Sequence, residues 1–216
     1  GLQKASRGEF LGIPFAKPPT GENRFLPPVP AQSYQEVKAF DFGPICVQTG
    51  YFLEKDRGKI LGAEDCLSLN VYTPGKFDAT EKKPVLVWIH GGGFTLGSAK
   101  EYDPEPLMRS QDILVVTINY RLGHLGFLTF GNSIVSGNMG LRDQIEALRW
   151  IQEHIEKFGG DPNKVTIFGE SAGAASVQYL QLSPLAENLF SGVIAQSGTA
   201  LLYRKDDEVS KNWRTA

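Results

Sequence analysis

The sequence predicts an α/β fold, with a mostly parallel central sheet and helices packed against its faces. Several short apolar runs are bounded by turn residues, which is typical of strands that are covered on both faces. Apolar residues at helical spacing predict an amphipathic helix between two of these runs, over residues 141–158. Strand, helix, strand, helix, strand in this order favours a parallel sheet with helical crossovers. The predicted strands are residues 85–89, 113–118, 165–168 and 193–195.

The other elements are predicted from local composition. Residues 66–72 alternate between apolar and polar side chains, which indicates a half-buried strand. The long helix is expected to end at residues 159–162, where two glycines precede an aspartate and a proline. A second helix is expected to end near Leu182. Residues 1–45 are rich in proline, so we expect an extended, loop-rich segment along the edge of the domain.

The composition is that of an ordinary globular protein and excludes several functions. The formal net charge is −2 at pH 7, so nothing attracts the chain electrostatically to nucleic acid or to an anionic membrane. No apolar run approaches the length of a transmembrane segment. No cluster of histidine or cysteine indicates a metal site, and we expect neither a metal nor an organic cofactor.

The chain has two cysteines, Cys46 and Cys66. A bridge between them would close a loop of about 20 residues and stabilise the fold by roughly 3 kcal/mol. Two unrelated buried thiols are the alternative, because free cysteine is among the most buried residue types. The residues alone leave both possibilities open.

A Gly-x-Ser-x-Gly motif stands at residues 169–173, between a predicted strand and a predicted helix. In this context the motif predicts a nucleophile elbow, with Ser171 strained and exposed at a sharp turn. Gly169 and Gly173 would leave room where a Cβ would collide with neighbouring backbone. Taken alone, the motif is also typical of ordinary surface turns, but a second motif supports the catalytic interpretation.

The second motif is His-Gly-Gly-Gly at residues 90–93, directly after the strand predicted at residues 85–89. Consecutive glycines leave backbone N–H groups unshielded, so two donors can point at one developing oxyanion. A flexible loop and a phosphate cradle are the alternatives. Phe94 and Thr95 follow where a phosphate-binding loop needs lysine and serine or threonine, which excludes the cradle. Each motif supplies one half of the chemistry of acyl transfer.

With both motifs in place, the sequence resembles the type-B carboxylesterase/cholinesterase family of α/β-hydrolases, from about Phe10 to Gly198. Bacterial relatives of hormone-sensitive lipase lack the Glu-Asp-Cys-Leu block and the proline-rich start. The resemblance implies that residues 1–216 are the N-terminal portion of a single α/β-hydrolase domain, incomplete at its C-terminus, with a lead-in over residues 1–45 and a core from about residue 66. The motifs that carry it are residues 10–16, 64–71, 90–94, 119–123, 140–144, 158–162, 168–173 and 196–198.

The resemblance implies roles for individual residues near the two motifs. Ser171 is similar to the nucleophile of the family. Gly92, Gly93 and Ala172 are similar to the residues whose N–H groups form the oxyanion hole.

Further residues match supporting positions of the family. The resemblance implies that Glu170 is a buried carboxylate beside the nucleophile and that Ser197 lies near the catalytic acid. Cys46 and Cys66 match the first disulfide of the family, which favours a bridge and, with it, secretion or the lumen of the endoplasmic reticulum.

Four charged residues match two structural ion pairs of the family, Arg24 with Glu64 and Arg121 with Asp143. The residues alone favour a different interpretation, in which all four are solvated surface charges.

The predicted catalytic machinery lacks two parts. A serine hydroxyl needs a histidine base and an orienting acid, which follow the serine in α/β-hydrolases. All three histidines, His90, His124 and His154, precede Ser171, and none of the acids after it, Glu187 and residues 206–208, matches the acid of the family. We expect the acid and the base in a C-terminal half beyond this chain, so that these residues alone are inactive.

Two departures from the family narrow the predicted substrate. Residues 47–65 contain Tyr51 and Phe52 but no tryptophan that could stack on a choline cation. Glu170 stands where juvenile-hormone esterases typically have glutamine. We expect a general, insect-like carboxylesterase that acts on a small-molecule ester through an acyl-serine. The alternative is a non-catalytic, cholinesterase-like adhesion or binding ectodomain, and the sequence leaves the oligomeric state open.

Overall fold

A computed structural model gives the fold of the chain. Some residues named above lie outside the part of the chain that it describes, namely Tyr51, Phe52 and the acids at residues 206–208. The described residues are 1–4, 6–32, 36–50, 56–75, 78–131 and 135–201.

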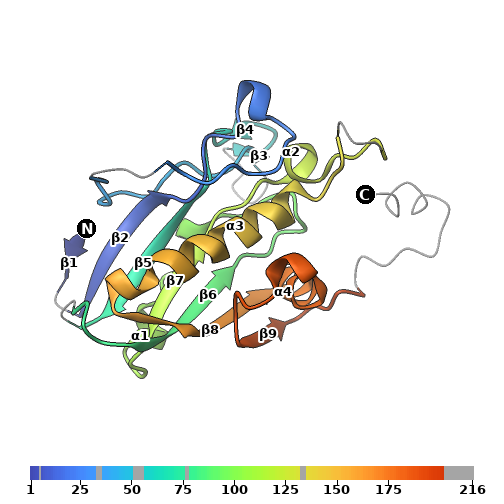
Figure 1. The fold of residues 1–216 in the computed structure, drawn as a ribbon. Helices are drawn as coiled ribbons and strands as arrows, with labels where there is room; N and C mark the ends of the chain where they lie inside the picture. The colour runs from blue at the N-terminus through green and yellow to red at the C-terminus, as the bar shows by residue number, and fades with distance from the viewer. Residues whose placement is uncertain (5, 33–35, 51–55, 76–77, 132–134, 202–216) are drawn as a thin grey trace.

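The centre of the structure is a seven-stranded sheet in the order β1-β2-β5-β7-β6-β8-β9 (Figure 1). β6, β7, β8 and β9 are parallel to one another, and β2 runs in the same direction, whereas β1 and β5 are antiparallel to their neighbours. The sheet is therefore mostly parallel, as predicted. Its strands are β1 (Leu2–Gln3), β2 (Arg7–Pro14), β5 (Ser68–Pro74), β6 (Lys83–Ile89), β7 (Leu114–Ile118), β8 (Gly160–Glu170) and β9 (Gly192–Gln196).

Two helices, α3 and α4, lie on the same face of this sheet (Figure 1). α3 continues into a 3₁₀ turn at Ile155–Phe158 and stops at Gly159, whose φ of +82° is the left-handed conformation of a glycine C-cap. The predicted end of the helix is confirmed. The α-helices are α1 (Glu105–Met108), α2 (Gly123–Phe127), α3 (Met139–His154) and α4 (Ala172–Leu182), and a separate two-stranded sheet joins β3 (Gln48–Thr49) to β4 (Ile60–Leu61).

The main hydrophobic core lies between the sheet and the two long helices. Alternate residues of β6 point into it, and Val85, Val87 and Ile89 are completely buried there. On the other face of the sheet, a smaller cluster joins Val115 to Met108 of α1. Because both faces are covered, strands such as β6 and β7 are nearly continuous apolar runs.

β5 is buried on both faces, so the prediction of a half-buried strand is wrong. Asn70, near the middle of β5, is buried with hydrogen-bond partners on both sides of its amide. Asn70 donates from Nδ2 to Thr117 Oγ1 at 2.9 Å, and its Oδ1 accepts from the Gly12 amide at 2.9 Å. A buried polar group that is hydrogen-bonded costs little, so a polar residue in the pattern, such as Asn70, does not mark a solvent-exposed face.

The proline-rich start of the chain contains an eight-residue strand, β2, that the composition did not predict. β2 pairs antiparallel with β5, and its register shifts between Phe10 and Ile13. Gly12 lies in this irregularity with φ of +68°, and a Cβ there would come within 2.5 Å of Asp41 O. A bulge of this kind interrupts the periodic pattern from which a strand is predicted.

The two expected ion pairs form, in different surroundings. Arg121 donates to both carboxylate oxygens of Asp143, at 2.8 and 2.7 Å, and the two side chains are only 4% and 0% exposed. Arg24 and Glu64 are 2.8 Å apart and partly exposed. The interpretation of all four residues as solvated charges is therefore wrong for the buried pair.

We predict that Asp143→Asn lowers the free energy of unfolding by about 3–5 kcal/mol, because Arg121 would keep its buried charge without a counter-charge. Urea unfolding at neutral pH measures this change. Glu64→Gln is the matched control at the exposed pair, where water solvates both partners and a much smaller loss is expected. Equal losses in the two variants would contradict the prediction.

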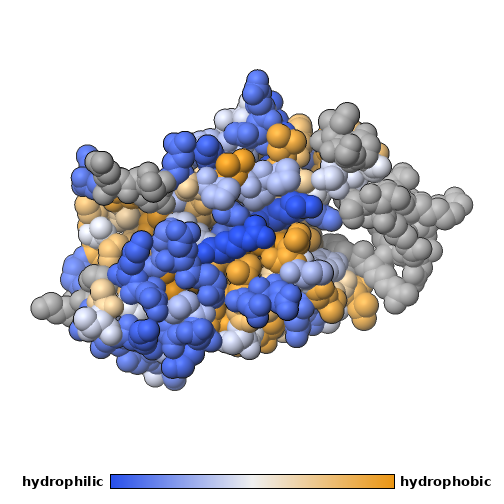
Figure 2. Space-filling model, viewed as in Figure 1, coloured by the Kyte–Doolittle hydropathy of each residue, from blue (hydrophilic) through white to orange (hydrophobic). Residues whose placement is uncertain are grey.

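Apolar surface remains around α4 and the edge strand β9. Figure 2 shows apolar side chains gathered beside α4, on the face that carries the two long helices. Leu182, at the end of α4, is 76% exposed, and Ile194 of β9 is 47% exposed. Among the described residues, no helix is both long and apolar enough to cross a membrane.

Candidate active site

The elbow forms at the junction of β8 and α4, and Ser171 is the single residue between them. Its backbone has φ of +53° and ψ of −116°, a conformation that costs a non-glycine residue energy. The Ser171 amide donates to Gln196 O of β9 at 2.9 Å, and its carbonyl accepts from the Ala175 amide at 3.0 Å. The strained turn is therefore held by hydrogen bonds on both sides. Ser171 is half-buried rather than fully exposed.

The two glycines of the motif lie where the elbow crosses the end of β6. A Cβ on Gly173 would come within 2.1 Å of Ile89 O, and one on Gly169 would come within 2.5 Å of the carbonyl carbon of Gly173. Real side chains do not approach backbone so closely. The expected reason for both glycines, a lack of room for a Cβ, agrees with this geometry.

The glycine turn after β6 lies directly beside the elbow. Gly92 and Gly93 have φ of +102° and +61°, and the amides of Thr95 and Leu96 both donate to Gly92 O, at 3.0 and 3.1 Å. A Cβ built on Gly91 would lie 3.3 Å from the Cβ of Ser171. The two motifs, which are far apart in the sequence, therefore meet in the structure.

Three backbone amides in this region are unoccupied donors. In the part of the chain that the structure describes, the N–H groups of Gly92, Gly93 and Ala172 donate to no other group. Ala172 is the first residue of α4, where an amide has no acceptor within the helix and the helix dipole adds positive charge. Beside Ser171, such donors could bind a negatively charged oxygen.

Two supporting residues differ in burial. Glu170 is half-buried, not buried as expected, because the alternation of β8 directs it away from the face that α3 and α4 cover. It still lies against the glycine turn, since a Cβ on Gly91 would be 2.9 Å from Glu170 Oε2. Ser197 is exposed directly after β9 with φ of +55°. Their suggested roles stay predictions.

The three histidines have structural surroundings. His90 is 1% exposed, its Nδ1 lies 2.8 Å from Gly91 O, and its ring stacks on that of Tyr120 at 4.4 Å. Burial lowers the pKa of His90 to about 4, so the ring is neutral at pH 7. His124 is exposed on α2, and His154 packs edge-on against Trp150.

Sequence reasoning missed the residue that supports His90. Tyr120 is completely buried and donates its hydroxyl to His90 O at 2.8 Å. It lies within the Asn-Tyr-Arg-Leu-Gly motif, which was the only signal that could have found it. Among the described residues, no three histidine, cysteine, aspartate or glutamate side chains come together as a metal site.

A model of the carboxylesterase family matches residues 2–213. The chain belongs to the carboxylesterase family. Among curated proteins, it is 50% identical to carboxylesterase 1E of Mus musculus and 48% identical to a carboxylic ester hydrolase of Bombus ignitus; each match covers 89% of this chain. It matches 36% and 35% of those relatives, so it spans about a third of their length.

Solved structures of the family have the same fold. The thermophilic PNB esterase superposes with a TM-score of 0.83 at 42% identity, covering 92% of this chain and 42% of its own. Juvenile hormone esterase from Manduca sexta gives a TM-score of 0.85 at 38% identity, covering 97% of this chain and 40% of its own. The predicted α/β-hydrolase fold is confirmed. The adhesion alternative gains no support, since these relatives are named as esterases.

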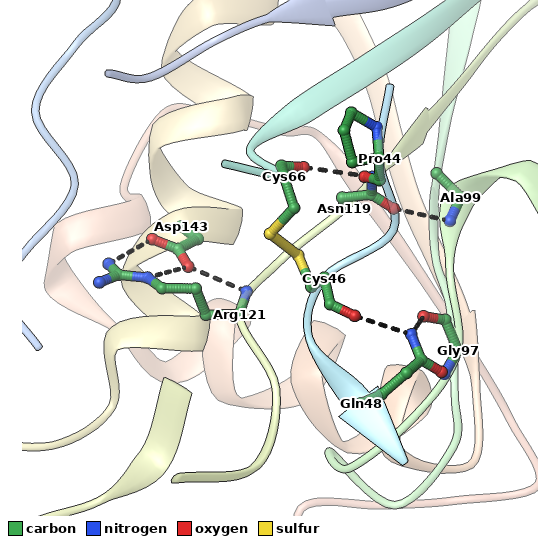
Figure 3. Close-up of a disulfide and its surroundings, with 9 residues drawn as sticks. All are labelled: Pro44, Cys46, Gln48, Cys66, Gly97, Ala99, Asn119, Arg121 and Asp143. Atoms are coloured by element: carbon green, nitrogen blue, oxygen red, sulfur yellow. Dashed lines mark hydrogen bonds and ion pairs between the residues drawn. A yellow bond between two sulfur atoms is a disulfide. The ribbon is translucent and has the colours of Figure 1, made fainter. Parts of the chain in front are cut away.

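The disulfide implied by the family resemblance is present. Cys46 and Cys66 form a disulfide (Figure 3). The bridge joins the segment just before β3 to the segment just before β5. The interpretation as two unrelated thiols is wrong. The compartment that a disulfide suggests stays a prediction.

We predict that His90 makes the protein less stable as pH falls from about 6.5 to about 4. Burial lowers the pKa of His90 to about 4 in the folded protein, whereas in the unfolded chain the pKa is about 6.5, so in this window the unfolded chain binds a proton that the folded protein does not. The loss in the free energy of unfolding reaches about 3 kcal/mol near pH 4, and no loss is expected well above pH 6.5.

Urea unfolding at a series of pH values tests this prediction. His90→Asn should flatten the dependence between pH 6.5 and 4 relative to the unmodified protein, whatever its effect at pH 7. His124→Asn, at the exposed histidine, is the control and should keep the original slope. Parallel curves for His90→Asn and the unmodified protein would contradict the burial effect.

Proposed function

We propose that the whole protein is a carboxylic ester hydrolase that works through an acyl-serine. The observation that carries the proposal is Ser171 at φ of +53°, beside three amides that donate to no other group in the described chain. Ser171 is the nucleophile, and the N–H groups of Gly92, Gly93 and Ala172 form the oxyanion hole. Family membership supports the same chemistry.

The reaction proceeds in two acyl transfers. Ser171 Oγ attacks the ester carbonyl carbon while a histidine takes its proton, and the carbonyl electrons move to the oxygen, which the three amides bind. Collapse of this intermediate expels the alcohol, which receives the proton from the histidine. Water then attacks the acyl-serine in the same way and releases the carboxylic acid. Removing one oxyanion donor from such a site costs about 10²–10³ in turnover.

We infer that the base and the acid belong to sequence that follows this chain. His90 is buried and neutral, and its ring is enclosed by Tyr120 and Gly97, so it suits a supporting role. The edge strand β9 ends beside the elbow and carries the exposed side chain of Ile194. Further chain packed on this edge would reach Ser171 and cover apolar surface.

The substrate we propose is a small-molecule ester of broad structure. The absence of tryptophan between residues 47 and 65 disfavours choline esters. The similar relatives include proteins named as carboxylesterases, which supports a carboxylic ester as the substrate. The disulfide favours secretion or the lumen of the endoplasmic reticulum, where thiols are oxidised.

We predict that a fluorophosphonate probe labels the whole protein at one serine, and that Ser171→Ala abolishes labelling. The probe reacts only with an activated nucleophile that has an oxyanion hole beside it. Gel fluorescence and peptide mapping measure the labelling. Ser183→Ala, at the other end of α4, is the control and should be labelled like the unmodified protein. Labelling that survives in Ser171→Ala would refute the proposed nucleophile.

We also predict that residues 1–216 alone do not turn over a chromogenic acetate ester, whereas the whole protein does. Without a base, the Ser171 hydroxyl keeps its proton and is a weak nucleophile. Release of the chromophore is followed at neutral pH. Appreciable hydrolysis by the 216 residues that disappears in Ser171→Ala would show that a base is already present, contrary to the prediction.

A further inference from the structure

The amide side chain of Gln48 joins the disulfide segment to the end of the glycine turn (Figure 3). Its Nε2 donates to Cys46 O at 3.0 Å and to Gly97 O at 2.9 Å, and its Oε1 accepts from the Gly97 amide at 2.9 Å. Both peptide groups of Gly97 are therefore held by one side chain. Only this orientation of the amide satisfies all three bonds, because the nitrogen can only donate and the oxygen can only accept.

Gly97 packs directly against the start of the glycine turn. Its φ is +109°, and a Cβ there would lie 2.5 Å from His90 Nδ1 and 2.8 Å from Gly91 O. Because Gly97 packs this closely against His90 and Gly91, a displacement of Gly97 would also displace these residues, which lead into Gly92. The turn is short, and the Leu96 amide closes it by donating to Gly92 O at 3.1 Å.

A second amide side chain fixes the residues that follow this turn to the other arm of the disulfide. Asn119 accepts from the Ala99 amide at 2.9 Å and donates to Cys66 O and Pro44 O, both at 3.2 Å (Figure 3). Residues 97 and 99 are thus anchored to the two arms that the Cys46–Cys66 bridge holds together.

We propose that Gln48 is a positioning residue for the oxyanion donors, and that through Gln48 the disulfide segment holds Gly92 and Gly93 in place. The proposal rests on the proposed function. Glycines are flexible, and an oxyanion hole is effective only when its donors are already aimed at the transition state. Gln48 restricts the turn without touching substrate, so its loss acts on the transition state more than on substrate binding.

Kinetics of the whole protein test this proposal, with Gln48→Met as the variant that keeps the length of the side chain and removes its hydrogen bonds. We expect kcat for an acetate ester to fall about 10- to 100-fold, as for a misplacement of the order of 1 Å, with KM within about twofold. Affinity for an alkyl trifluoromethyl ketone, whose adduct with serine carries the oxyanion, should weaken by a similar factor.

Gln152→Met is the matched control for lost hydrogen bonds. Gln152 is also half-buried and also donates to two carbonyls, Pro162 O at 2.8 Å and Leu189 O at 3.0 Å, but on α3. This variant should keep kcat and ketone affinity even where its melting temperature falls as far as that of Gln48→Met. An unchanged kcat in Gln48→Met, or an equal loss in both variants, would overturn the positioning role.

Gln48→Glu is the second variant, because it keeps the acceptor for the Gly97 amide and loses both donors. We expect Gln48→Glu to lower kcat, as Gln48→Met does. If neither Gln48 variant yields folded protein, the residue serves folding, and the proposal is overturned. An unmodified protein with neither hydrolysis nor probe labelling would refute the proposed function itself, whereas an active protein with an unaffected Gln48→Met refutes only the positioning role.

Discussion

The parallel register of β6, β8 and β9 is the constraint on which the candidate site depends. Ile89 pairs with Gly169, and Glu170 pairs with Gln196, so the carboxyl ends of the three strands lie at one edge of the sheet. In open parallel sheets this edge is where ligands bind. The glycine turn, the elbow and Ser197 follow these three ends directly, and their meeting therefore follows from the strand pairing.

The close crossing of the elbow over β6 depends on the same register. Gly173 lies so near Ile89 O that any side chain would force the helix away, and a Cβ on Gly169 would collide with the backbone of Gly173. An elbow lifted by a side chain would move Ser171 away from the glycine turn. The two glycines are thus required by a backbone contact between elements, beyond the local turn that the motif suggests.

Sequence reasoning predicted the parts whose signals are local. The apolar runs of β6 and β8 and the Gly-x-Ser-x-Gly context suffice for the elbow, because strand, turn and helix are consecutive. It did not predict the burial of Asn70, whose partner Thr117 is 47 residues away, since a period-two pattern looks the same with or without a distant partner. The contact of Gln48 with Gly97, over 49 residues, was equally invisible.

The family resemblance supplied what local signals could not, but only for positions with a recognisable motif. It pointed to the bridge between Cys46 and Cys66 and to the buried pair of Arg121 and Asp143. Gln48 lies just outside the motifs, in a two-residue strand without periodicity, so neither composition nor resemblance indicated it. The partners of Gln48 are backbone groups, which every residue has. Only the fold determines which backbone groups lie next to its side chain.

Strained backbone is concentrated at the candidate site. Phe94, Ser171 and Ser197 all have positive φ without being glycine, at a cost of order 1–3 kcal/mol each, and all three adjoin the candidate site. Such conformations persist only where neighbouring structure holds them. The supporting structure consists of the completely buried residues of β6 and β8, the stacked rings of His90 and Tyr120, and the two amide side chains that are hydrogen-bonded to the disulfide segments. Rigid supporting structure of this kind lets strained residues keep a fixed geometry. Preorganised donors in an oxyanion hole require such a geometry.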